Sequence, residues 1–324
     1  MVQLEQIRKF AEQVKENMNQ VIVGKEAVID QLLIAMIASG HVLLEDVPGT
    51  GKTLLAKTLA KSIQCTFKRI QFTPDLLPSD LSGINFYNQK NSAFEFRPGP
   101  IFTNILLADE INRATPRTQS SLLECMEERQ VSIDGETHTL EKPFLVIATQ
   151  NPIENQGTFP LPEAQLDRFL IKVTMGYPSA EEGIAILRRF KEDNPLTDIQ
   201  PVADKSVILD VQKSYSSVQV SEALLGYLIE LAERTRKHPD IVTGVSPRGT
   251  QSLLKAVQVY AILQGRDYVI PDDIKNMVKP VWAHRMVTRH SVRMNAQGSV
   301  AEKALDQILQ AVPVPAEANL AAKG

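Results

Sequence analysis

A short segment containing two glycines constrains the fold of this chain more than any other part of the sequence. The segment Glu45–Thr53 (EDVPGTGKT) lies between an apolar run, His41–Glu45, and a stretch of helical periodicity, Thr53–Ser62. Gly49 and Gly51 let the backbone turn tightly enough for successive N–H groups to face one phosphate. The amino end of the following helix adds its positive dipole. The succession of strand, loop and helix therefore predicts a nucleotide-phosphate site in an α/β fold.

The chemistry of this loop depends on two side chains. Lys52 would place its ammonium group on the β- and γ-phosphates, and the Thr53 hydroxyl would be a magnesium ligand. The generic pattern has glycine at position 46, where this chain has Asp46. An ordinary glycine-rich turn is the alternative, but the flanking strand and helix favour the phosphate site. The predicted nucleotide-binding residues of the loop are Pro48, Gly49, Thr50, Gly51, Lys52, Thr53 and Leu54.

Strand and helix signals alternate through the first half of the chain, which indicates a parallel sheet covered by helices. The runs lack polar alternation, as expected of strands buried on both faces. The predicted strands are His41–Glu45, Phe67–Phe72, Ile105–Ala108, Phe144–Thr149 and Phe169–Thr174. Two segments between them read as hairpins inserted on the sheet, near 83–99 and 131–140. The second contains Asp134-Gly135, a strong hairpin signal.

Two carboxylates follow the third predicted strand. Asp109 and Glu110 would point into the nucleotide crevice, because parallel strands present their carboxyl ends at one edge. Asp109 is the predicted outer partner of magnesium, and Glu110 is predicted to orient or deprotonate the attacking water. Asn151 ends the next strand and can hold water near the γ-phosphate. Solvated carboxylates and a turn asparagine are the alternatives, and the preceding phosphate loop favours the catalytic interpretation.

The composition changes near Gly176–Pro178, and we predict a domain boundary there. Residues 1–177 would form the α/β nucleotide-binding domain, and residues 178–311 an all-helical lid. Residues 312–324 are rich in proline and alanine, and we expect them to be disordered. The predicted lid helices cover Glu181–Asp193, Ser221–His238 with Ser221 as N-cap, Ser246 to about Leu263, and a segment that begins at Pro271.

Bulk composition excludes several classes of protein. The 324 residues carry a formal net charge of −3, which gives no reason to expect a polyanionic partner. Cys65 and Cys125 are too few for a disulfide framework and indicate a reducing compartment. The amino-terminal residues do not resemble an export signal, and the apolar runs are too short to span a bilayer, so we expect a cytoplasmic protein. The five histidines lack metal-ligand spacing, which leaves magnesium with ATP as the only predicted metal.

Two further groups of residues receive plain structural interpretations. Trp282 and Tyr260 lie on apolar helix faces, and we expect them in the core rather than as stacking platforms. A basic cluster near the carboxyl end favours a solvated helix face or a subunit interface over a nucleic-acid site. Its members are Lys275, Lys279, Arg285, Arg289 and Arg293.

The order of Lys52, Glu110 and Asn151, followed by a helical domain, resembles the AAA+ superfamily. Four longer matches narrow the resemblance to the MoxR family, over about residues 4 to 310. They are Phe94–Phe102 (FEFRPGPIF), Leu107–Ala114 (LADEINRA), Gln150–Pro152 (QNP) and Leu161–Phe169 (LPEAQLDRF). The resemblance implies a P-loop core with a five-stranded parallel sheet and a helical lid, assembled into rings, usually hexamers. It also implies that the hairpins are the helix-2 insert and the pre-sensor insert.

The resemblance assigns roles to residues that periodicity did not single out. Arg168 matches the arginine finger that reaches a neighbour's γ-phosphate, and Arg248 matches the sensor 2 arginine of the lid. Val23 and Gly24 resemble the backbone segment that contacts adenine, although Lys25 stands where the related pattern often has glutamine. A surface ion pair between Arg168 and Asp167 or Glu163, and a first-turn helix position without a ligand for Arg248, are the alternatives. Whether Arg248 acts on its own subunit's nucleotide or a neighbour's stays open, and Arg113 is only a possible interface residue.

These features predict an ATP-binding and ATP-hydrolysing machine that uses Mg²⁺. The resemblance implies chaperone-like remodelling or maturation of protein complexes, with client proteins that include von Willebrand factor A domain proteins. A nucleic-acid-stimulated motor and a nucleotide-gated assembly scaffold are the alternative functions. No residue of the sequence identifies the client.

Overall fold

Five parallel strands form the central sheet of the computed structural model, which describes residues 2–151, 157–191, 195–289 and 297–315. The strands are β1 (Val42–Glu45), β2 (Phe67–Gln71), β5 (Ile105–Asp109), β8 (Leu145–Gln150) and β9 (Ile171–Val173). Their order is β2-β5-β8-β1-β9, and every pairing is parallel. The predicted five-stranded parallel sheet is confirmed.

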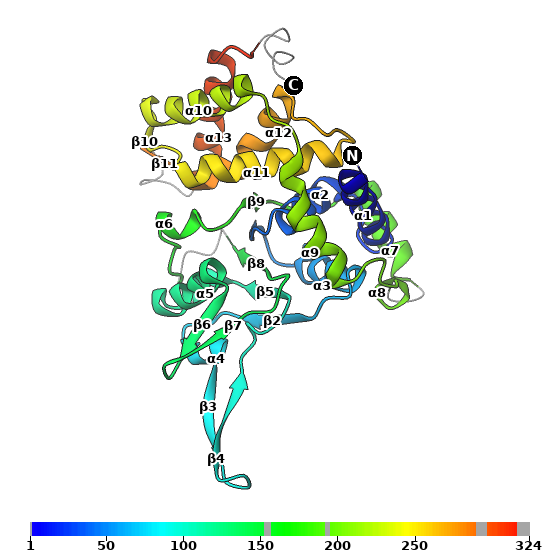
Figure 1. The fold of residues 1–324 in the computed structure, drawn as a ribbon, viewed down its shortest axis with the longest axis vertical. Coiled ribbons are helices and arrows are strands. Elements are labelled where there is room, and N and C mark those ends of the chain that lie inside the picture. The colour runs from blue at the N-terminus through cyan, green and yellow to red at the C-terminus, as the bar shows by residue number, and fades with distance from the viewer. Residues whose placement is uncertain (1, 152–156, 192–194, 290–296, 316–324) are drawn as a thin grey trace.

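Helices cover both faces of this sheet, as Figure 1 shows with the sheet nearly edge-on. The helices α1 (Val2–Asn19), α2 (Glu26–Ile37) and α3 (Lys52–Ser62) lie on one side, and α5 (Pro116–Glu128) lies on the other. Alternate strand residues therefore enter two different cores. Leu44 and Leu107 belong to the first core, whereas Leu43 and Leu106 belong to the second. Burial on both faces explains why the central strands are apolar without alternation.

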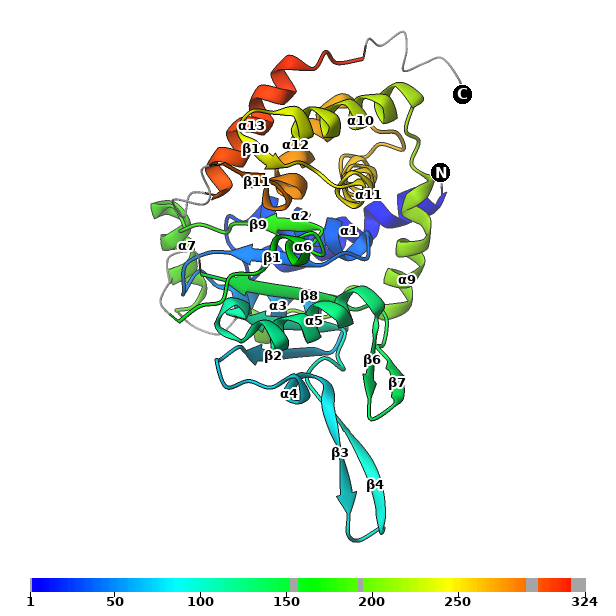
Figure 2. The same cartoon turned by 90° about the vertical axis from the view of Figure 1, so that its left-hand side faces the viewer.

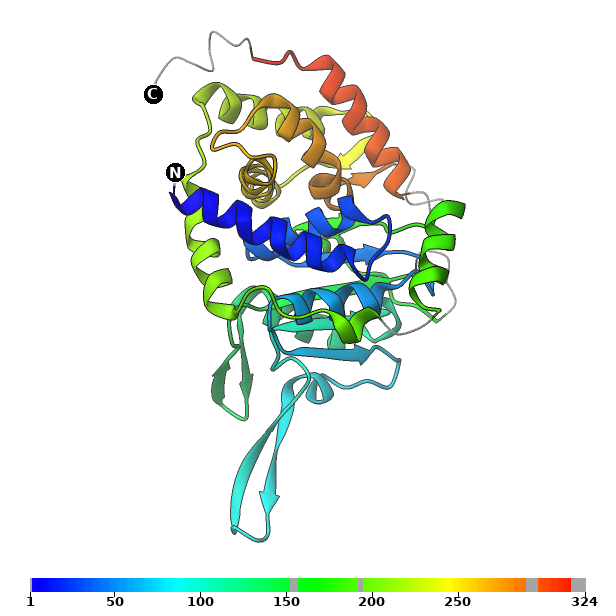
Figure 3. The same ribbon diagram turned by 90° about the vertical axis from the view of Figure 1, so that its right-hand side faces the viewer.

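Both predicted hairpins are present. Strands β3 (Gly83–Asn88) and β4 (Ala93–Pro98) follow the short helix α4 (Pro78–Ser82) and extend far from the body (Figure 3). Strands β6 (Gln130–Ile133) and β7 (Glu136–Thr139) form the second hairpin. Asp134 and Gly135 both have positive φ, at 50° and 87°, as the Asp-Gly signal predicts for a tight turn.

The β6–β7 hairpin contacts the base of the longer β3–β4 hairpin, through its turn and through β7. The Asn85 amide donates to the Asp134 carboxylate at 2.9 Å, and the rings of Phe96 and His138 stack with centroids 4.3 Å apart. Phe102 meets the edge of Phe96 from the body of the domain. Sequence reasoning treated the two insertions as separate, and the structure joins them.

The second half of the chain is mostly helical. Its elements are α6 (Glu163–Leu166), α7 (Ala180–Arg189), α8 (Pro195–Asp198), α9 (Lys205–Ser214), α10 (Glu222–Lys237), α11 (Pro247–Leu263), α12 (Pro271–Trp282) and α13 (Gln297–Ala311), with a short antiparallel pair, β10 (Ile241–Thr243) and β11 (Val287–Thr288). The predicted caps are confirmed: Ser221 Oγ accepts from Leu224 N at 3.3 Å, and Ser246 Oγ accepts from Gly249 N at 3.0 Å. Helix α7 ends at Arg189, earlier than predicted.

The domain boundary near 177 stays a prediction. Helix α9 follows it in the chain yet packs against α2, where the Gln212 amide donates to the Met36 carbonyl at 2.7 Å. Most of the predicted disordered tail, residues 316–324, lies outside the described residues, as does Asp193. No helix in the described ranges is long and apolar enough to cross a membrane.

Burial confirms one interpretation of the helical half and corrects another. Trp282 is fully buried, and its Nε1 donates to the Gly249 carbonyl at 2.9 Å, while Tyr260 packs partly buried against the same core. The expectation that the basic cluster lies on a solvated helix face or a subunit interface is wrong for Arg285, which is buried within its own chain. Its guanidinium is buried and bonds Asp167 at 2.7 Å and the Phe169 carbonyl at 2.6 Å, which ties the segment after α12 to the segment before β9. Burial lowers the pKa of Arg285 to about 10.

We predict that Arg285→Met destabilises the protein by about 3–5 kcal/mol, because it leaves Asp167 without its buried cation. Urea unfolding of the whole chain measures the effect. Arg289→Met is the matched control, since Arg289 is exposed, and it should change stability little. Equal losses in both variants would contradict the assignment of Arg285 to a structural ion pair.

Candidate nucleotide-binding site

The predicted phosphate loop runs from the carboxyl end of β1 into helix α3 (Figure 2). Gly49 and Gly51 have φ angles of 85° and 92°, a left-handed conformation that side-chain-bearing residues avoid. A Cβ at either position would meet no atom within 4 Å, so backbone conformation, rather than crowding, requires glycine there. Lys52 Nζ donates to the Asp46 carbonyl at 2.9 Å and so bridges the base of the loop. Open space beside these glycines and a lysine at the helix start fit a phosphate chain.

Asp46 has a structural role that accounts for its departure from the glycine pattern. Its carboxylate is buried and accepts three backbone N–H bonds, from Val47 at 2.8 Å, Met175 at 3.1 Å and Gly176 at 2.9 Å. Met175 and Gly176 follow β9, so the carboxylate joins the phosphate loop to the segment that leads into α7. The aspartate thus replaces glycine at a position whose φ is not left-handed.

Asp109 is the last residue of β5 and Glu110 follows it, so both lie at the carboxyl end of this strand, as predicted. Thr149 Oγ1 connects them, because it donates to Asp109 at 2.5 Å and accepts from the Glu110 N–H at 2.9 Å. The Glu110 carboxylate accepts from the Gln71 amide at 2.5 Å and pairs with Arg113 at 2.9 Å. Glu110 also has a φ of 55°, a conformation that costs energy for a non-glycine residue and is frequent at functional sites.

Asn151 follows β8, the neighbour of both β1 and β5 in the sheet, and is buried. The Gln150 carbonyl beside it accepts from the Asp46 N–H at 3.2 Å. The predicted phosphate loop, the two carboxylates and Asn151 therefore all lie at the carboxyl ends of the strands. That is where ligands bind in open α/β sheets.

The predicted adenine segment reaches the same region through α7. A Cβ on Gly24 would collide with the Glu182 carboxyl group, and Lys25 Nζ donates to the Tyr177 carbonyl at 3.4 Å. Val23 and Gly24 therefore lie against the start of α7, next to the linker that Asp46 holds. Any contact of these two residues with adenine stays a prediction.

Arg168 and Arg248 lie at the opposite end of the strands, on the side of their amino ends. Arg168 precedes β9, and both arginines line a cavity of about 470 Å³ with residues 38–41, which precede β1. The phosphate loop follows β1, and at about 3.3 Å per residue the strand separates its two ends by about 10 Å or more. Neither arginine is brought to its own chain's phosphate loop.

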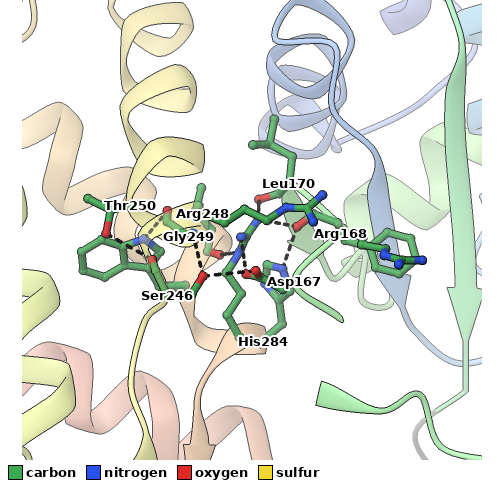
Figure 4. Close-up of polar contacts among 12 residues, drawn as sticks. Asp167, Arg168, Leu170, Ser246, Arg248, Gly249, Thr250 and His284 are labelled. Carbon is green, nitrogen blue, oxygen red and sulfur yellow. Dashed lines mark hydrogen bonds and ion pairs between the residues drawn. The ribbon is translucent and has the colours of Figure 1, made fainter. Parts of the chain in front are cut away.

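Both arginines pair with a residue that sequence reasoning did not single out. Glu127 Oε2 lies 2.5 Å from Arg248 Nη2 and 3.7 Å from Arg168 Nε. The ion pair of Arg168 with Asp167 or Glu163, which was the alternative to an arginine finger, is therefore not the one formed. Asp167 instead bonds Arg285, and it accepts from Ser246 Oγ at 3.1 Å (Figure 4).

The cavity around the arginines is strongly cationic. Besides Arg168 and Arg248, its lining includes Arg129, Lys255 and Arg285, against the carboxylates of Glu127 and Asp167. Burial lowers the pKa of Arg129 to about 10, with Glu127 opposing the shift. An excess of cations over anions fits an oxyanion supplied from outside the chain.

The described residues hold no group of three or more His, Cys, Asp or Glu side chains suited to a metal ion. A magnesium ion held by Thr53 and Asp109 would take its remaining ligands from phosphate oxygens and water, as is common for this ion.

Comparison with known proteins identifies the family. A model of the ATPase family associated with various cellular activities (AAA) matches residues 41–171, and an AAA lid domain model matches residues 233–308. Chaperone MoxR1 of Mycobacterium tuberculosis is 41% identical over 91% of this chain and 80% of its own length. Protein MoxR of Paracoccus denitrificans is 32% identical over 92% of this chain and 94% of its own. The chain belongs to the MoxR family of AAA+ ATPases.

Two further chains similar to this one span nearly the same length. An uncharacterized protein, YeaC, of Bacillus subtilis is 50% identical over 93% of this chain and 94% of its own. The crystal structure of a "putative ATPase" from Cytophaga hutchinsonii superimposes with a TM-score of 0.89, at 39% identity, and covers 97% of both chains. The agreement in fold extends to the helical half.

We predict that Asp46→Asn lowers the free energy of unfolding by about 2 kcal/mol, because an amide nitrogen cannot accept and asparagine keeps either the Val47 bond or the Met175 and Gly176 bonds, not all three. Denaturant unfolding without nucleotide measures it. Asp75→Asn, at an exposed loop aspartate, is the control and should leave stability nearly unchanged. Equal stability of wild type and Asp46→Asn would contradict the role assigned to this carboxylate.

Proposed function

We propose that this chain hydrolyses ATP at sites shared between neighbouring subunits of a ring, which the family resemblance predicts to be a hexamer. The observation that carries the proposal is the location of Arg168 and Arg248 at the sheet edge opposite their own phosphate loop. One subunit would supply the loop and carboxylates, and its neighbour would supply the arginines. This assigns Arg248, as well as Arg168, to the neighbour's nucleotide.

On the loop side, the residues divide the work of hydrolysis. Lys52 and the loop N–H groups bind the β- and γ-phosphates, and Val23 and Gly24 are the proposed adenine contacts. Magnesium, when bound, neutralises phosphate charge, and Thr53 and Asp109 would hold it. The Glu110 carboxylate accepts the proton of the attacking water after it has released Gln71 and Arg113. Asn151 holds that water in place by hydrogen bonding.

On the arginine side, the guanidinium groups stabilise charge that develops on the transferred phosphoryl group. Arginine fingers of this kind contribute on the order of 10³–10⁵ in rate. A cavity rich in cations supports this role because it favours an oxyanion over water.

The biological role that we propose is chaperone-like remodelling of protein complexes, including von Willebrand factor A domain proteins. The name of the mycobacterial relative, Chaperone MoxR1, supports a client-directed function. The β3–β4 hairpin supports it physically, because it exposes large apolar side chains: Phe94 is 74% exposed, Tyr87 52% and Ile84 49%. Exposed apolar clusters on a projecting element favour contact with protein.

We predict that Lys52→Ala and Glu110→Gln fail in different ways. Lys52→Ala should lose most of its ATP affinity, whereas Glu110→Gln should bind ATP normally and turn over at least about 100-fold more slowly, since it lacks the base. Equilibrium binding of a fluorescent ATP analogue and phosphate release separate the two. Equal loss of binding in both variants would refute the assigned roles.

We also predict that inactive variants complement one another. Arg168→Ala and Arg248→Ala should each turn over far more slowly than wild type, and each should regain activity when mixed with Lys52→Ala, because a mixed ring contains intact loops beside intact arginines. Phosphate release is measured after subunit exchange, with the assembled mass recorded on the same samples. Failure of every mixture in rings shown to exchange subunits would refute a shared site.

A further inference from the structure

Glu127, near the end of helix α5, contacts both arginines with the same oxygen. Its Oε2 lies 2.5 Å from Arg248 Nη2 and 3.7 Å from Arg168 Nε. Arg248 comes from the first turn of α11 and Arg168 from the segment before β9, so one carboxylate connects guanidinium groups from two distant parts of the chain.

A second carboxylate already fixes the backbones that carry these arginines. Asp167, next to Arg168, binds Arg285 and accepts from Ser246 Oγ, the N-cap of α11 (Figure 4). Ser246 lies two residues before Arg248. The segment before β9 and the start of α11 are therefore held together at the backbone that carries the two arginines. Glu127 sets the relative position of the guanidinium groups themselves.

The two ion pairs of Glu127 can be replaced by ion pairs between the same arginines and a phosphate group. The Glu127 side chain is 36% exposed, and those of Arg168 and Arg248 are 30% and 43% exposed, so water weakens both ion pairs. Carboxylate and phosphate oxygens accept from guanidinium groups in similar geometry. The oxygen of Glu127 thus occupies a position, between two guanidinium groups, that suits a phosphate oxygen of a neighbour's nucleotide.

The charge of the cavity favours a carboxylate at the position of Glu127. Arg129 and Lys255 line the same space, so Arg168 and Arg248 would repel these cations and each other if Glu127 were neutral. A neutral side chain would let the two guanidinium groups separate, and misplaced catalytic groups lose much of their effect.

We infer that Glu127 is a positioning residue, which holds Arg168 and Arg248 as one pair and transfers both together to the neighbour's phosphate. The inference rests on the proposed shared site. Glu127 itself does not touch the reacting atoms.

The first test is the turnover of Glu127→Gln, which preserves size and removes charge. We expect kcat to fall about 10-fold, with the KM for ATP within about twofold of wild type, because the loop side is unchanged. Glu128→Gln is the matched control, since it is the next carboxylate of α5 and does not line the cavity, and it should behave as wild type. A kcat for Glu127→Gln within twofold of wild type would overturn the inference.

The second test separates positioning from general damage to the fold. Arg168→Lys and Arg248→Lys are measured alone and together, in wild-type and Glu127→Gln backgrounds. If Glu127 holds the pair, each arginine change should cost at least about threefold less in the Glu127→Gln background than in wild type. If each arginine substitution lowers kcat by the same factor in both backgrounds, Glu127 does not position the pair.

Subunit mixing distinguishes failure of this inference from failure of the proposed function. Glu127→Gln mixed with Lys52→Ala should regain turnover, since the second protein supplies intact arginines and Glu127. If Arg168→Ala is complemented by Lys52→Ala but Glu127→Gln is not, the shared site stands and the role of Glu127 falls. If no arginine variant is complemented in exchanging rings, both proposals fall.

Discussion

Strand β1 lies inside the sheet between β8 and β9, with apolar cores on both of its faces. Because its backbone is bonded on both sides, its two ends cannot move independently. The phosphate loop follows its carboxyl end, and the cationic cavity begins with residues 38–41 at its amino end. The polarity of a parallel sheet therefore places the predicted phosphate loop and the arginines proposed for the neighbour's nucleotide at opposite ends of the strands.

Two carboxylates, one buried and one half-buried, connect this sheet to the rest of the chain. Asp46 binds the backbone after β9, and Asp167 binds Arg285 and the cap of α11. Each lies beside a residue assigned to nucleotide chemistry, the first at the phosphate loop and the second next to Arg168. Displacement of the phosphate loop would therefore strain the linker into α7, and displacement of α11 would strain the segment that carries Arg168.

The sequence predicted those features that depend on local chemistry. Unalternating apolar runs, the paired glycines and the serine caps at 221 and 246 each determine a conformation within a few residues. Asp109 and Glu110 could be located because strand ends in a parallel sheet share an edge. The same rule could have found Thr149 and Gln71, polar residues at the ends of β8 and β2. Glu127 and Arg285 gave no comparable signal, because their partners are distant in sequence and only the packing of α5, α11 and the segment after α12 brings them together.

The end of helix α5 joins the cavity directly to the projecting hairpins. Glu127 lies near the last turn, and Arg129, with a φ of 55°, reverses the chain into β6. The Arg129 guanidinium donates to the Ser39 and Phe144 carbonyls, and the β6–β7 hairpin then stacks His138 on Phe96 of the longer hairpin. Because these contacts are continuous, a rotation of the end of α5 would displace the β6–β7 hairpin and, through it, the base of the longer hairpin.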